Sequence, residues 1–502
     1  MTLSKSRYCM GMQCPKMLWM DINMPSRFDP SASDETRLET GNIVSELAKG
    51  YFGNFIEVPF SHNKSEMIEK TRQLMDEGTR IIAEASFEYE GNFCSADILK
   101  AVSGGYELIE IKSSSDSDES SKIKSVYLDD MAYQTYILTH CGIVVKKVSI
   151  LQLNRDYVRH GELNIQELFV LTDCTETIFS MQQDVARHIS EISAIAKQPN
   201  EPNTAVGSHC HKPYDCGYRR WCFQNLPKNN VFEIGWGMWG SKKDEAYSIG
   251  LVTFEDILNS DVKHKLTEKQ TRQITAATQN LPPHIDKKAI SDFLSKIKYP
   301  LYYLDFETFP QPIPEWDNVS PYTQIPFQYS LHIQDTPRGT ERHKEFLAKE
   351  GIDPRRPLAD HLCADIPKNA CVIAYNMAFE KGRIKELAAL FPDLSDHLMS
   401  IHDNMIDLII PFQSGAYYCK EMGGSYSIKS VLPALCPNDP KLDYNALNLI
   451  HNGSDAMNAY AALVNKSPEE IAKIRAALLA YCRLDTLAMV KILEKLYDVA
   501  GK

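Results

Sequence analysis

An apolar segment that contains two acidic residues constrains the fold of this chain more than any other segment does. The segment Tyr302-Tyr-Leu-Asp-Phe-Glu-Thr308 is rich in the aromatic and aliphatic residues typical of a buried β-strand. Side chains two positions apart on a strand point to the same face, so we expect Asp305 and Glu307 to lie together. Two carboxylates on a buried face repel each other and are costly to desolvate. A divalent cation between them relieves both costs, and the segment therefore predicts a metal site on a core strand.

The length of 502 residues predicts more than one domain. We expect a first domain over residues 1–225, a partly helical connector over 226–297 and a last domain over 298–502. Strand-like and helix-like segments alternate in the last domain, which ends in a long helix predicted from Pro468 to Val499. Alternation of this kind is typical of layered folds, so the predicted fold class is α/β.

Charge and hydropathy restrict the functional class and the compartment. The net charge of −12 argues against a protein that coats nucleic acid through a global positive field, although it is compatible with a carboxylate-based nuclease. No segment approaches the roughly 18 apolar residues of a membrane span, and no apolar signal core follows Lys5 and Arg7. We therefore predict a cytoplasmic protein without a membrane partner. Thirteen irregularly spaced cysteines in that compartment indicate metal binding rather than disulfides.

Two further segments of the last domain carry acidic residues in recognisable positions. Cys371-Val-Ile-Ala-Tyr-Asn376 is predicted as a second core strand that leads into a helix with Glu380. Tyr481 and Asp485 are four residues apart on the long helix, so both lie on one helical face. The order along the chain is therefore Asp-x-Glu on a strand, Asn-x3-Glu entering a helix, and Tyr-x3-Asp within a helix.

This order of motifs resembles the DEDD exonuclease superfamily in its tyrosine-bearing subclass, which has a ribonuclease-H-like fold and includes ribonuclease D. The resemblance covers about residues 298–500 and implies a 3′ to 5′ exonuclease. It also implies that Tyr481 orients the attacking water. The ligands of two Mg²⁺ or Mn²⁺ ions would be Asp305, Glu307, Glu380 and Asp485.

One position departs from the pattern of that family. The second motif usually ends in Asp, whereas Glu380 stands at that place here. The longer side chain still chelates a metal, but it shifts the metal or weakens the enzyme. Asp403 and Asp407 are alternative carboxylates, and we keep Asp407 as a further candidate ligand.

A hairpin in the first domain carries a second group of charged residues. The segments 97–102 and 106–112 flank Ser103-Gly104-Gly105, a sequence that favours a tight turn. In the simplest register Asp97 lies opposite Glu110, and this pair of like charges requires a cation. Lys112 shares the face of Glu110, where it would neutralise charge on a phosphate or orient water.

An Asp followed across a hairpin by Glu-x-Lys resembles the PD-(D/E)XK nucleases. The fuller strings Ala96-Asp-Ile-Leu99 and Leu108-Ile-Glu-Ile-Lys-Ser-Ser114 are similar to the RecB branch of that family. The resemblance implies a restriction-endonuclease-like domain at the N-terminus. Besides the hairpin residues, it implies catalytic roles for Gln134 on the following helix and for Glu46 on a helix predicted over Ser33 to Lys49.

Three cysteines follow that nuclease-like region in the pattern Cys210-x5-Cys216-x5-Cys222. A fourth soft ligand would complete a tetrahedral site, with Cys14 as the favoured donor and Cys9 as the alternative. One N-terminal and three C-terminal cysteines resemble the RecB-type nucleases that hold an iron–sulfur cluster, which implies [4Fe-4S]. The spacing differs from the common one, so zinc is the alternative, and His209 and His211 would suit it. Such a site closes a loop of about 200 residues, so its loss should unfold the domain.

The combined patterns predict a metal-dependent DNA nuclease with two active sites. We expect DNA that is single-stranded or has free ends as its partner, in DNA processing, repair or defence. The whole pattern resembles bacterial fusion proteins whose C-terminal part is a domain of unknown function. The alternatives are an RNA-processing exonuclease, or a nucleic-acid-binding scaffold with one degenerate site. The polar helix at Leu266 to Leu281, with Gln270, Arg272 and Gln273, either guides DNA or is a structural linker.

Overall fold

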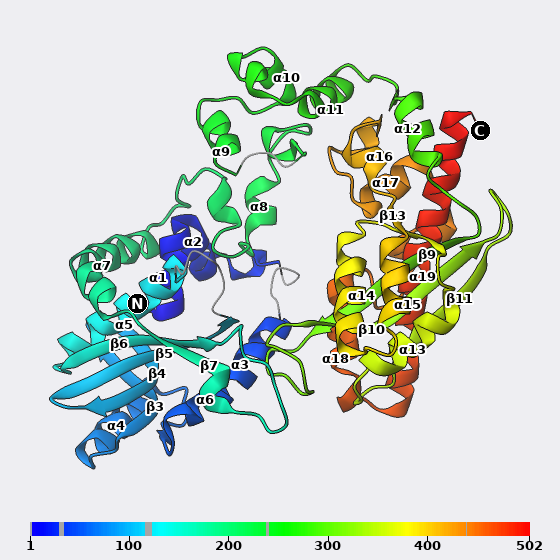
Figure 1. Ribbon diagram of the computed structural model, residues 1–502. Helices are drawn as coiled ribbons and strands as arrows, with labels where there is room; N and C mark the ends of the chain where they lie inside the picture. The colour runs from blue at the N-terminus through cyan, green and yellow to red at the C-terminus, as the bar shows by residue number, and fades with distance from the viewer. Residues whose placement is uncertain (1–2, 30–34, 116–122, 237–239, 438, 502) are drawn as a thin grey trace. The chain divides into compact units, whose positions relative to one another are not determined.

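The fold is known from a computed structural model, shown in Figure 1, that describes residues 3–29, 35–115, 123–236, 240–437 and 439–501. The chain forms two compact units. The first unit contains residues 1–225 with 312–322, and the second contains 226–311 with 323–502. The predicted α/β class is confirmed, because both units combine helices with mixed sheets. Within the described residues, no helix is long and apolar enough to cross a membrane.

A seven-stranded mixed sheet forms the centre of the first unit, in the order β2-β3-β4-β5-β6-β7 with β1 beside β4. Strand β4 is antiparallel to β3 and β5, whereas β6 runs parallel to β5 and β7 antiparallel to β6. The strands are β1 (Leu3–Ser4), β2 (Ile56–Glu57), β3 (Ile81–Tyr89), β4 (Asn92–Val102), β5 (Gly105–Ser115), β6 (Val145–Leu153) and β7 (Phe169–Asp173).

The predicted hairpin is confirmed as β4 and β5. Val102 pairs with Gly105, so the turn consists of two residues, and Gly104 takes a left-handed φ of 77° that favours glycine. A Cβ atom on Gly105 would lie 2.2 Å from the carbonyl oxygen of Val144, so only glycine fits there. The ladder ends at Ile98 and Ile109, and this register places Asp97 and Glu110 side by side just beyond it.

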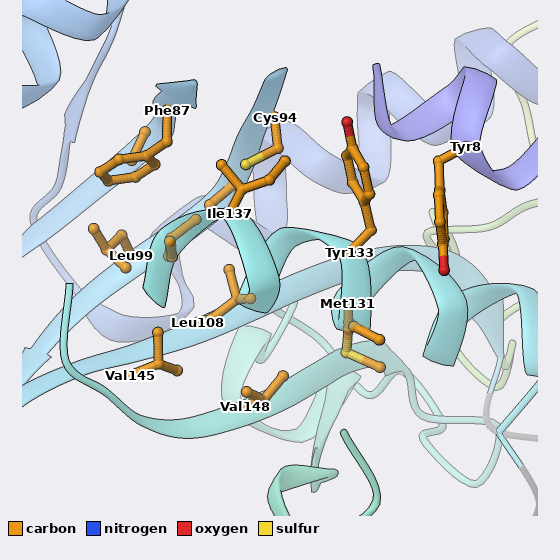
Figure 2. Packing of buried hydrophobic residues seen from close by; sticks show 14 of the residues in the cluster. Tyr8, Phe87, Cys94, Leu99, Leu108, Met131, Tyr133, Ile137, Val145 and Val148 are labelled. Carbon is orange, nitrogen blue, oxygen red and sulfur yellow. The ribbon is translucent and has the colours of Figure 1, made fainter. Parts of the chain in front are cut away.

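Helices cover both faces of this sheet. One core lies between the sheet and helices α1, α4, α5 and α7; in Figure 2, Leu108 and Val148 face Met131, and the Tyr8 and Tyr133 rings stack at 4.6 Å. A second core holds Ile109 and Ile111 against α3. The helices are α1 (Lys5–Gln13), α2 (Pro15–Asn23), α3 (Glu35–Lys49), α4 (Lys64–Asp76), α5 (Ser125–His140), α6 (Ile165–Leu168), α7 (Thr175–Ala196) and α8 (Arg219–Phe223).

The alternation on β5 therefore directs Glu110 and Lys112 toward the layer of α1 and α5, as the period of two predicts. The helix expected at Ser33 to Lys49 is confirmed over Glu35–Lys49, while residues 33 and 34 lie outside the described residues.

The second unit has a five-stranded sheet in the order β11-β10-β9-β12-β13. Strand β10 is antiparallel to both β9 and β11, and β9, β12 and β13 are parallel. Tyr302, Leu304 and Phe306 pack against α13, α14 and α15, so the alternate residues of β9 face the opposite layer, which includes α19. The strands are β9 (Leu301–Pro310), β10 (Gln324–Gln334), β11 (Arg342–Leu347), β12 (Cys371–Ala374) and β13 (Met405–Asp407), with β8 (His284–Ile285) paired to β14 (Tyr417–Tyr418) outside this sheet.

The long C-terminal helix is confirmed as α19, which begins at a capping box of Ser467 and Glu470 and ends at Ala500. Segment 226–297 belongs to the same unit, and β8 and α11 contact residues 413–424. The helices of the unit are α9 (Gly240–Ser248), α10 (Phe254–Leu258), α11 (Glu268–Thr278), α12 (Lys287–Leu294), α13 (Arg355–Asp365), α14 (Ala378–Leu390), α15 (Ser395–Asp403), α16 (Ile410–Gln413), α17 (Ile428–Leu435), α18 (Gly453–Ala461) and α19 (Pro468–Ala500).

Candidate functional sites

Four carboxylates of the second unit converge beside β9. Asp305 and Glu307 come from β9, and Asp485 from the facing α19. Ligand atoms of Asp305, Glu307 and Cys482 lie within 4.8 Å of one another, the one such group of three in the described ranges. Glu380 enters from the first turn of α14, and its charge acts on both β9 acids. The structure therefore brings together all four carboxylates predicted to bind metal.

The electrostatics of this group favour a bound cation. Burial, followed by the neighbouring charges, holds the pKa of Asp305 and that of Glu307 well above their usual range. Burial also raises the pKa of Glu380 to about 8. For Asp485 burial raises the pKa to about 6, although hydrogen bonds from Tyr444 and Tyr481 oppose the rise. Each carboxylate is thus costly to ionise unless positive charge is added.

The donor set fits a divalent cation such as Mg²⁺ or Mn²⁺. Oxygen ligands predominate, as such hard cations require. Glu380 is buried, and its Oε2 atom has no hydrogen-bond partner among the described residues. This oxygen is therefore available to coordinate a metal ion. The Cys482 thiol donates to Asp305 Oδ2 at 3.7 Å, so it serves as a partner of a carboxylate.

Aromatic and basic side chains that sequence reasoning missed surround the carboxylates. Tyr444, from the 3₁₀ turn Tyr444–Ala446, donates to Asp485 Oδ1 at 2.5 Å. Lys429 Nζ lies 5.2 Å from the centre of the Tyr481 ring and 5.3 Å from that of Tyr444. No local motif could have identified these residues, because the fold alone brings them beside Asp485.

The reserve candidate Asp407 has another environment. Its carboxylate accepts backbone N–H bonds from Asn376 at 2.9 Å, Met377 at 3.1 Å and Ile409 at 3.1 Å. These bonds hold the turn between β12 and α14, where Asn376 has a left-handed φ of 67°. Asp407 thus stabilises the turn that positions Glu380. Asp403, the other alternative, is exposed and pairs with His402.

Acidic and basic side chains alternate around the hairpin of the first unit. Lys5 Nζ lies 3.4 Å from Asp97 and 3.2 Å from Glu110. Lys112 Nζ lies 2.5 Å from Glu110 and 3.0 Å from Asp130. The Oδ2 atom of Asp97 accepts the N–H of Ile111 at 2.7 Å. These carboxylates therefore already have cationic partners within the protein.

Gln134 joins this group from α5, as the resemblance implied. Its Nε2 donates to Glu110 at 2.7 Å and to Asp130 at 2.9 Å, and its Oε1 has no partner among the described residues. Asp130 was missed, although it stands four residues before Gln134 on the same helical face. Lys5 was missed because no sequence pattern links the start of α1 to β5.

Glu84, which sequence reasoning missed, lies on the strand beside Asp97, whereas the predicted Glu46 is exposed. Glu46 has an exposed side chain and accepts a hydrogen bond from the buried Lys49 at 2.7 Å. Lys49 also lies 3.8 Å from Glu84, which the pairing of β3 with β4 places at the level of Asp97. Burial, followed by the charge of Asp97, raises the pKa of Glu84 to about 7. Glu84 thus lies on the strand next to Asp97 and interacts with its charge, and the turn Glu90-Gly91 could have revealed this register.

The four predicted cysteines line one small pocket of the first unit. Cys14 separates α1 from α2, and Cys210, Cys216 and Cys222 come from the segment that ends with α8. Burial, opposed by backbone N–H groups of Met17 and Lys16, raises the pKa of Cys14. Burial likewise raises the pKa of Cys216 and of Cys222 to about 11, so a bound metal would be needed to stabilise the thiolates.

The alternative ligands Cys9, His209 and His211 differ in whether they lie at the cysteine pocket. Cys9 packs near Asp130 and Lys112, away from the cysteine pocket. His209 lines the pocket, whereas His211 pairs with Asp215. Gln13 ties the two parts of the pocket together, because its Nε2 donates to the carbonyls of His209 at 2.9 Å and Tyr214 at 2.7 Å.

Comparison with known protein families gives a match to one segment of the chain. The family described as a domain of unknown function (DUF2779) matches residues 302–427. This range contains Asp305, Glu307 and Glu380 and ends before Tyr481 and Asp485. No solved structure matches the chain.

Three curated proteins of mycoplasmas are similar to parts of the chain. Uncharacterized protein MG366 homolog of Mycoplasma pneumoniae is 27% identical over 260 residues, which are 47% of this chain and 39% of that protein. Uncharacterized protein UU173 of Ureaplasma parvum is 30% identical over 174 residues, which are 32% and 25%. Uncharacterized protein MG366 of Mycoplasma genitalium is 27% identical over 227 residues, 41% and 33%. The matched regions span less than half the length of each relative.

Proposed function

We propose that this protein is a metal-dependent nuclease with two active sites, of which the second is a 3′ to 5′ exonuclease of the DEDD type. The observation that carries the proposal is the convergence of Asp305, Glu307, Glu380 and Asp485 beside Tyr481. Three buried carboxylates and the half-buried Asp305, all without lysine or arginine salt bridges within the described ranges, are suited to binding two divalent cations. DNA is the proposed substrate, and RNA is the alternative.

The residues around this group have complementary roles in the proposed reaction. Bound Mg²⁺ or Mn²⁺ would activate water and stabilise the leaving oxygen. Tyr444 holds the carboxylate of Asp485 through its 2.5 Å hydrogen bond. Tyr481, one helical turn before Asp485, would orient the attacking water. Lys429 supplies positive charge for a phosphate beside both tyrosine rings.

The sheet of the second unit supports the same proposal. If its strands are numbered along the chain from β9, their order is 3-2-1-4-5 and only the second is antiparallel to the others. This order places Asp305 and Glu307 on the central strand β9, where the sheet changes from antiparallel to parallel pairing. Acids on a central strand can be reached by side chains of the helices that pack on the sheet, such as Asp485 of α19.

The hairpin group supports a PD-(D/E)XK site in the first unit. Asp97 and Glu110 lie beside each other, Lys112 lies within 2.5 Å of Glu110, and Gln134 donates to Glu110. When a divalent cation binds the acids, Lys112 is placed to neutralise charge on a phosphate. The five-strand core β3 to β7 is also in sequential order, with helix α5 connecting the parallel strands β5 and β6.

The cysteine pocket suits a soft metal group, because Cys14, Cys210, Cys216 and Cys222 all line it. A [4Fe-4S] cluster is the proposed occupant on the basis of the resemblance to RecB-type nucleases, and zinc is the alternative. A brown colour of the purified protein that is lost in Cys216→Ser would identify the cluster, and stoichiometric zinc would identify the alternative.

Cleavage of labelled single- and double-stranded DNA and RNA with Mg²⁺ or Mn²⁺ tests the proposal. Asp305→Ala should slow shortening from the 3′ end by more than about a hundredfold, beyond what loss of an outer-shell partner costs. Lys112→Ala should slow the other cleavage reaction by about a hundredfold or more. The double variant should be inactive.

Three outcomes would contradict parts of this assignment. If neither substitution changes cleavage, the two-site assignment is wrong. If the wild-type protein binds nucleic acid and never cleaves it, the protein is a scaffold. If only RNA is shortened, the exonuclease processes RNA. Asp292→Asn, which changes an exposed acid of the second unit, is the matched control and should cleave like wild type.

A further inference from the structure

The second unit contains a cleft that the proposed reaction does not use. It has a volume of about 660 Å³, which is in the range of ligand-binding sites. Its lining combines aromatic, basic and polar side chains with one acid, Glu268, and comes from two segments far apart in sequence. The lining includes Trp236, Lys269, Arg272, Gln413 and Tyr426.

Trp236 is held in this cleft by an unusual backbone. Its φ of 59° is in the left-handed region, which is costly for a bulky side chain and occurs chiefly at functional sites. Its N–H donates to the carbonyl of Gly424 at 3.2 Å, and a Cβ atom on Gly235 would lie 2.1 Å from that same oxygen. The close contact of the two glycines thus fixes the position of the indole.

The aromatic surface of the cleft consists of more than one ring. The Trp236 ring lies 5.5 Å from Tyr426 and 5.8 Å from Tyr418. The indole Nε1 of Trp236 is buried and has no hydrogen-bond partner in the described part of the chain. Buried indole N–H groups usually find an acceptor, so this one is suited to an acceptor on a ligand.

Basic side chains lie directly beside these rings. Lys269 Nζ is 5.3 Å from the centre of the Trp236 ring and donates to the carbonyl of Gln413 at 2.6 Å. Arg272 donates to the carbonyl of Gly415 at 2.7 Å and lies 2.8 Å from Glu268. The hydrogen-bond acceptor of Lys269 is therefore a neutral carbonyl, and the positive charge of Lys269 is available to an anion.

A short segment connects the cleft to the carboxylate group. Tyr426 lines the cleft, and Lys429, three residues later, lies over the rings of Tyr444 and Tyr481. Three residues span at most about 11 Å, so the cleft and the acidic group are close neighbours. Tyr375, which directly precedes the turn that leads to Glu380, also contacts this segment, because its hydroxyl donates to the carbonyl of Tyr426 at 2.7 Å.

We propose that this cleft binds the single-stranded part of a nucleic acid whose 3′ end lies at the carboxylates. A base would stack on Trp236, while Lys269 and Arg272 would hold a phosphate. Aromatic rings flanked by cations recognise single strands in this way without reading their sequence. The inference rests on the proposed function of the carboxylates for the direction of the strand, but not for the binding itself.

Binding of a labelled oligonucleotide of about 12 nucleotides, followed by fluorescence anisotropy, tests the cleft. The Asp305→Asn variant serves as the parent protein, with EDTA present, so that the strand stays intact. Trp236→Ala should weaken binding about tenfold, the effect expected for loss of one stacked base. Trp236→Phe should restore most of it. Lys269→Glu should also weaken binding, and the weakening should diminish at high salt.

Lys288→Glu is the matched control, because Lys288 is an exposed lysine of the same unit outside the cleft. It should bind like the parent. Equal affinities of parent, Trp236→Ala and Lys269→Glu, with unchanged thermal unfolding, would overturn the inference. Lys269→Glu remains informative if Trp236→Ala does not fold.

Cleavage assays of the same substitutions in an otherwise wild-type protein distinguish the proposed cleft from the proposed nuclease function. With the cleft in use, Trp236→Ala raises KM for the 12-nucleotide strand and leaves KM for a dinucleotide unchanged. Equal KM values for the long strand would contradict the cleft, although cleavage itself persists. A wild-type protein that never cleaves, but whose binding depends on Trp236, would contradict the proposed function and support the cleft.

Discussion

The two acidic sites of this protein balance their charges in opposite ways. Around the hairpin of the first unit, Asp97, Glu110 and Asp130 already have Lys5 and Lys112 as partners at 2.5 to 3.4 Å. Around β9, by contrast, burial and mutual repulsion keep the pKa values of the carboxylates high, and Lys429 only partly offsets the repulsion. A metal ion at the first site must displace a lysine, whereas a metal ion at the second adds a charge that the site lacks.

The two sites also differ in what holds them in position. The β9 acids lie on the central strand of a five-stranded sheet and face a helix of 33 residues. In the first unit Lys5 begins α1, and the residue after the end of α1 is Cys14 of the cysteine pocket. The position of the hairpin site therefore depends on helix α1, which a metal group bound in the cysteine pocket can hold in place. Three predictions test these differences.

Loss of the metal group in the cysteine pocket should have the largest effect. Cys216→Ser should destabilise the first unit by about 4 kcal/mol or more, the range seen when a structural metal is lost. Cleavage that depends on Lys112 should disappear, while shortening from the 3′ end should continue. Thermal unfolding and the two cleavage reactions of the full chain provide the measurements.

Cys141→Ser is the control for that change. Cys141 is exposed and lies outside the pocket, so its substitution should change stability by no more than about 0.5 kcal/mol. If Cys216→Ser unfolds at the same temperature as wild type, the pocket does not hold the first unit together.

The next largest effect should be a change with pH in the free energy of unfolding of the metal-free protein. The folded pKa values of Asp485 and Glu380, about 6 and about 8, exceed the ordinary values of 3.8 and 4.5. The folded protein thus binds more protons than the unfolded chain, and stability is lost as pH rises through this window. The rise for Asp485 alone corresponds to about 3 kcal/mol in total, of which roughly half is lost between pH 5 and pH 8. Denaturant unfolding in EDTA at pH 5 and pH 8 measures the loss.

Asp305→Asn should reduce that loss, because it removes one of the repelling charges. Asp292→Asn, at an exposed surface pair, should leave it unchanged. Added Mn²⁺ should stabilise the wild type more at pH 8 than at pH 5, since metal binding requires ionised carboxylates. A metal-free protein that is more stable at pH 8 than at pH 5 would show that the acids are not mutually destabilising.

Local periodicity was sufficient to predict several pairs in these sites. The period of two placed Asp305 with Glu307, and the helical period placed Tyr481 with Asp485, because each pair lies within a single element. The Gly104 turn likewise fixed the hairpin register. These are relations over a few residues, where the backbone leaves few alternatives.

Relations across the fold could not be predicted in this way. Lys5 meets Glu110 across 105 residues, and Tyr444 meets Asp485 across 41. Such contacts depend on how helices pack on a sheet, and no spacing in the sequence records that. Glu84 lies between these two extremes of predictability. It is brought beside Asp97 by strand pairing in two successive hairpins, which turn signals in the sequence can reveal. The resemblance indicated Glu46 instead, a residue whose direct partner is Lys49.

Substitution of Lys5 should have the smallest effect, and it tests the charge balance of the first site directly. Lys5 Nζ lies between the Asp97 and Glu110 oxygens that would hold a metal. Lys5→Met keeps an unbranched side chain and removes the competing charge. Mn²⁺ should therefore bind the first site about fivefold more tightly, or by about 1 kcal/mol, the size of a partly exposed ion pair. Calorimetric titration with Mn²⁺ in an Asp305→Asn protein measures this affinity.

Lys147→Met provides the comparison, because Lys147 pairs with Glu107 and Asp173 rather than with the hairpin acids. It should leave the Mn²⁺ affinity unchanged. Weaker binding in Lys5→Met would mean that Lys5 helps to assemble the acids instead of competing for them. The first site would then resemble the second in needing added positive charge, and the contrast between the two sites would rest on Lys112 alone.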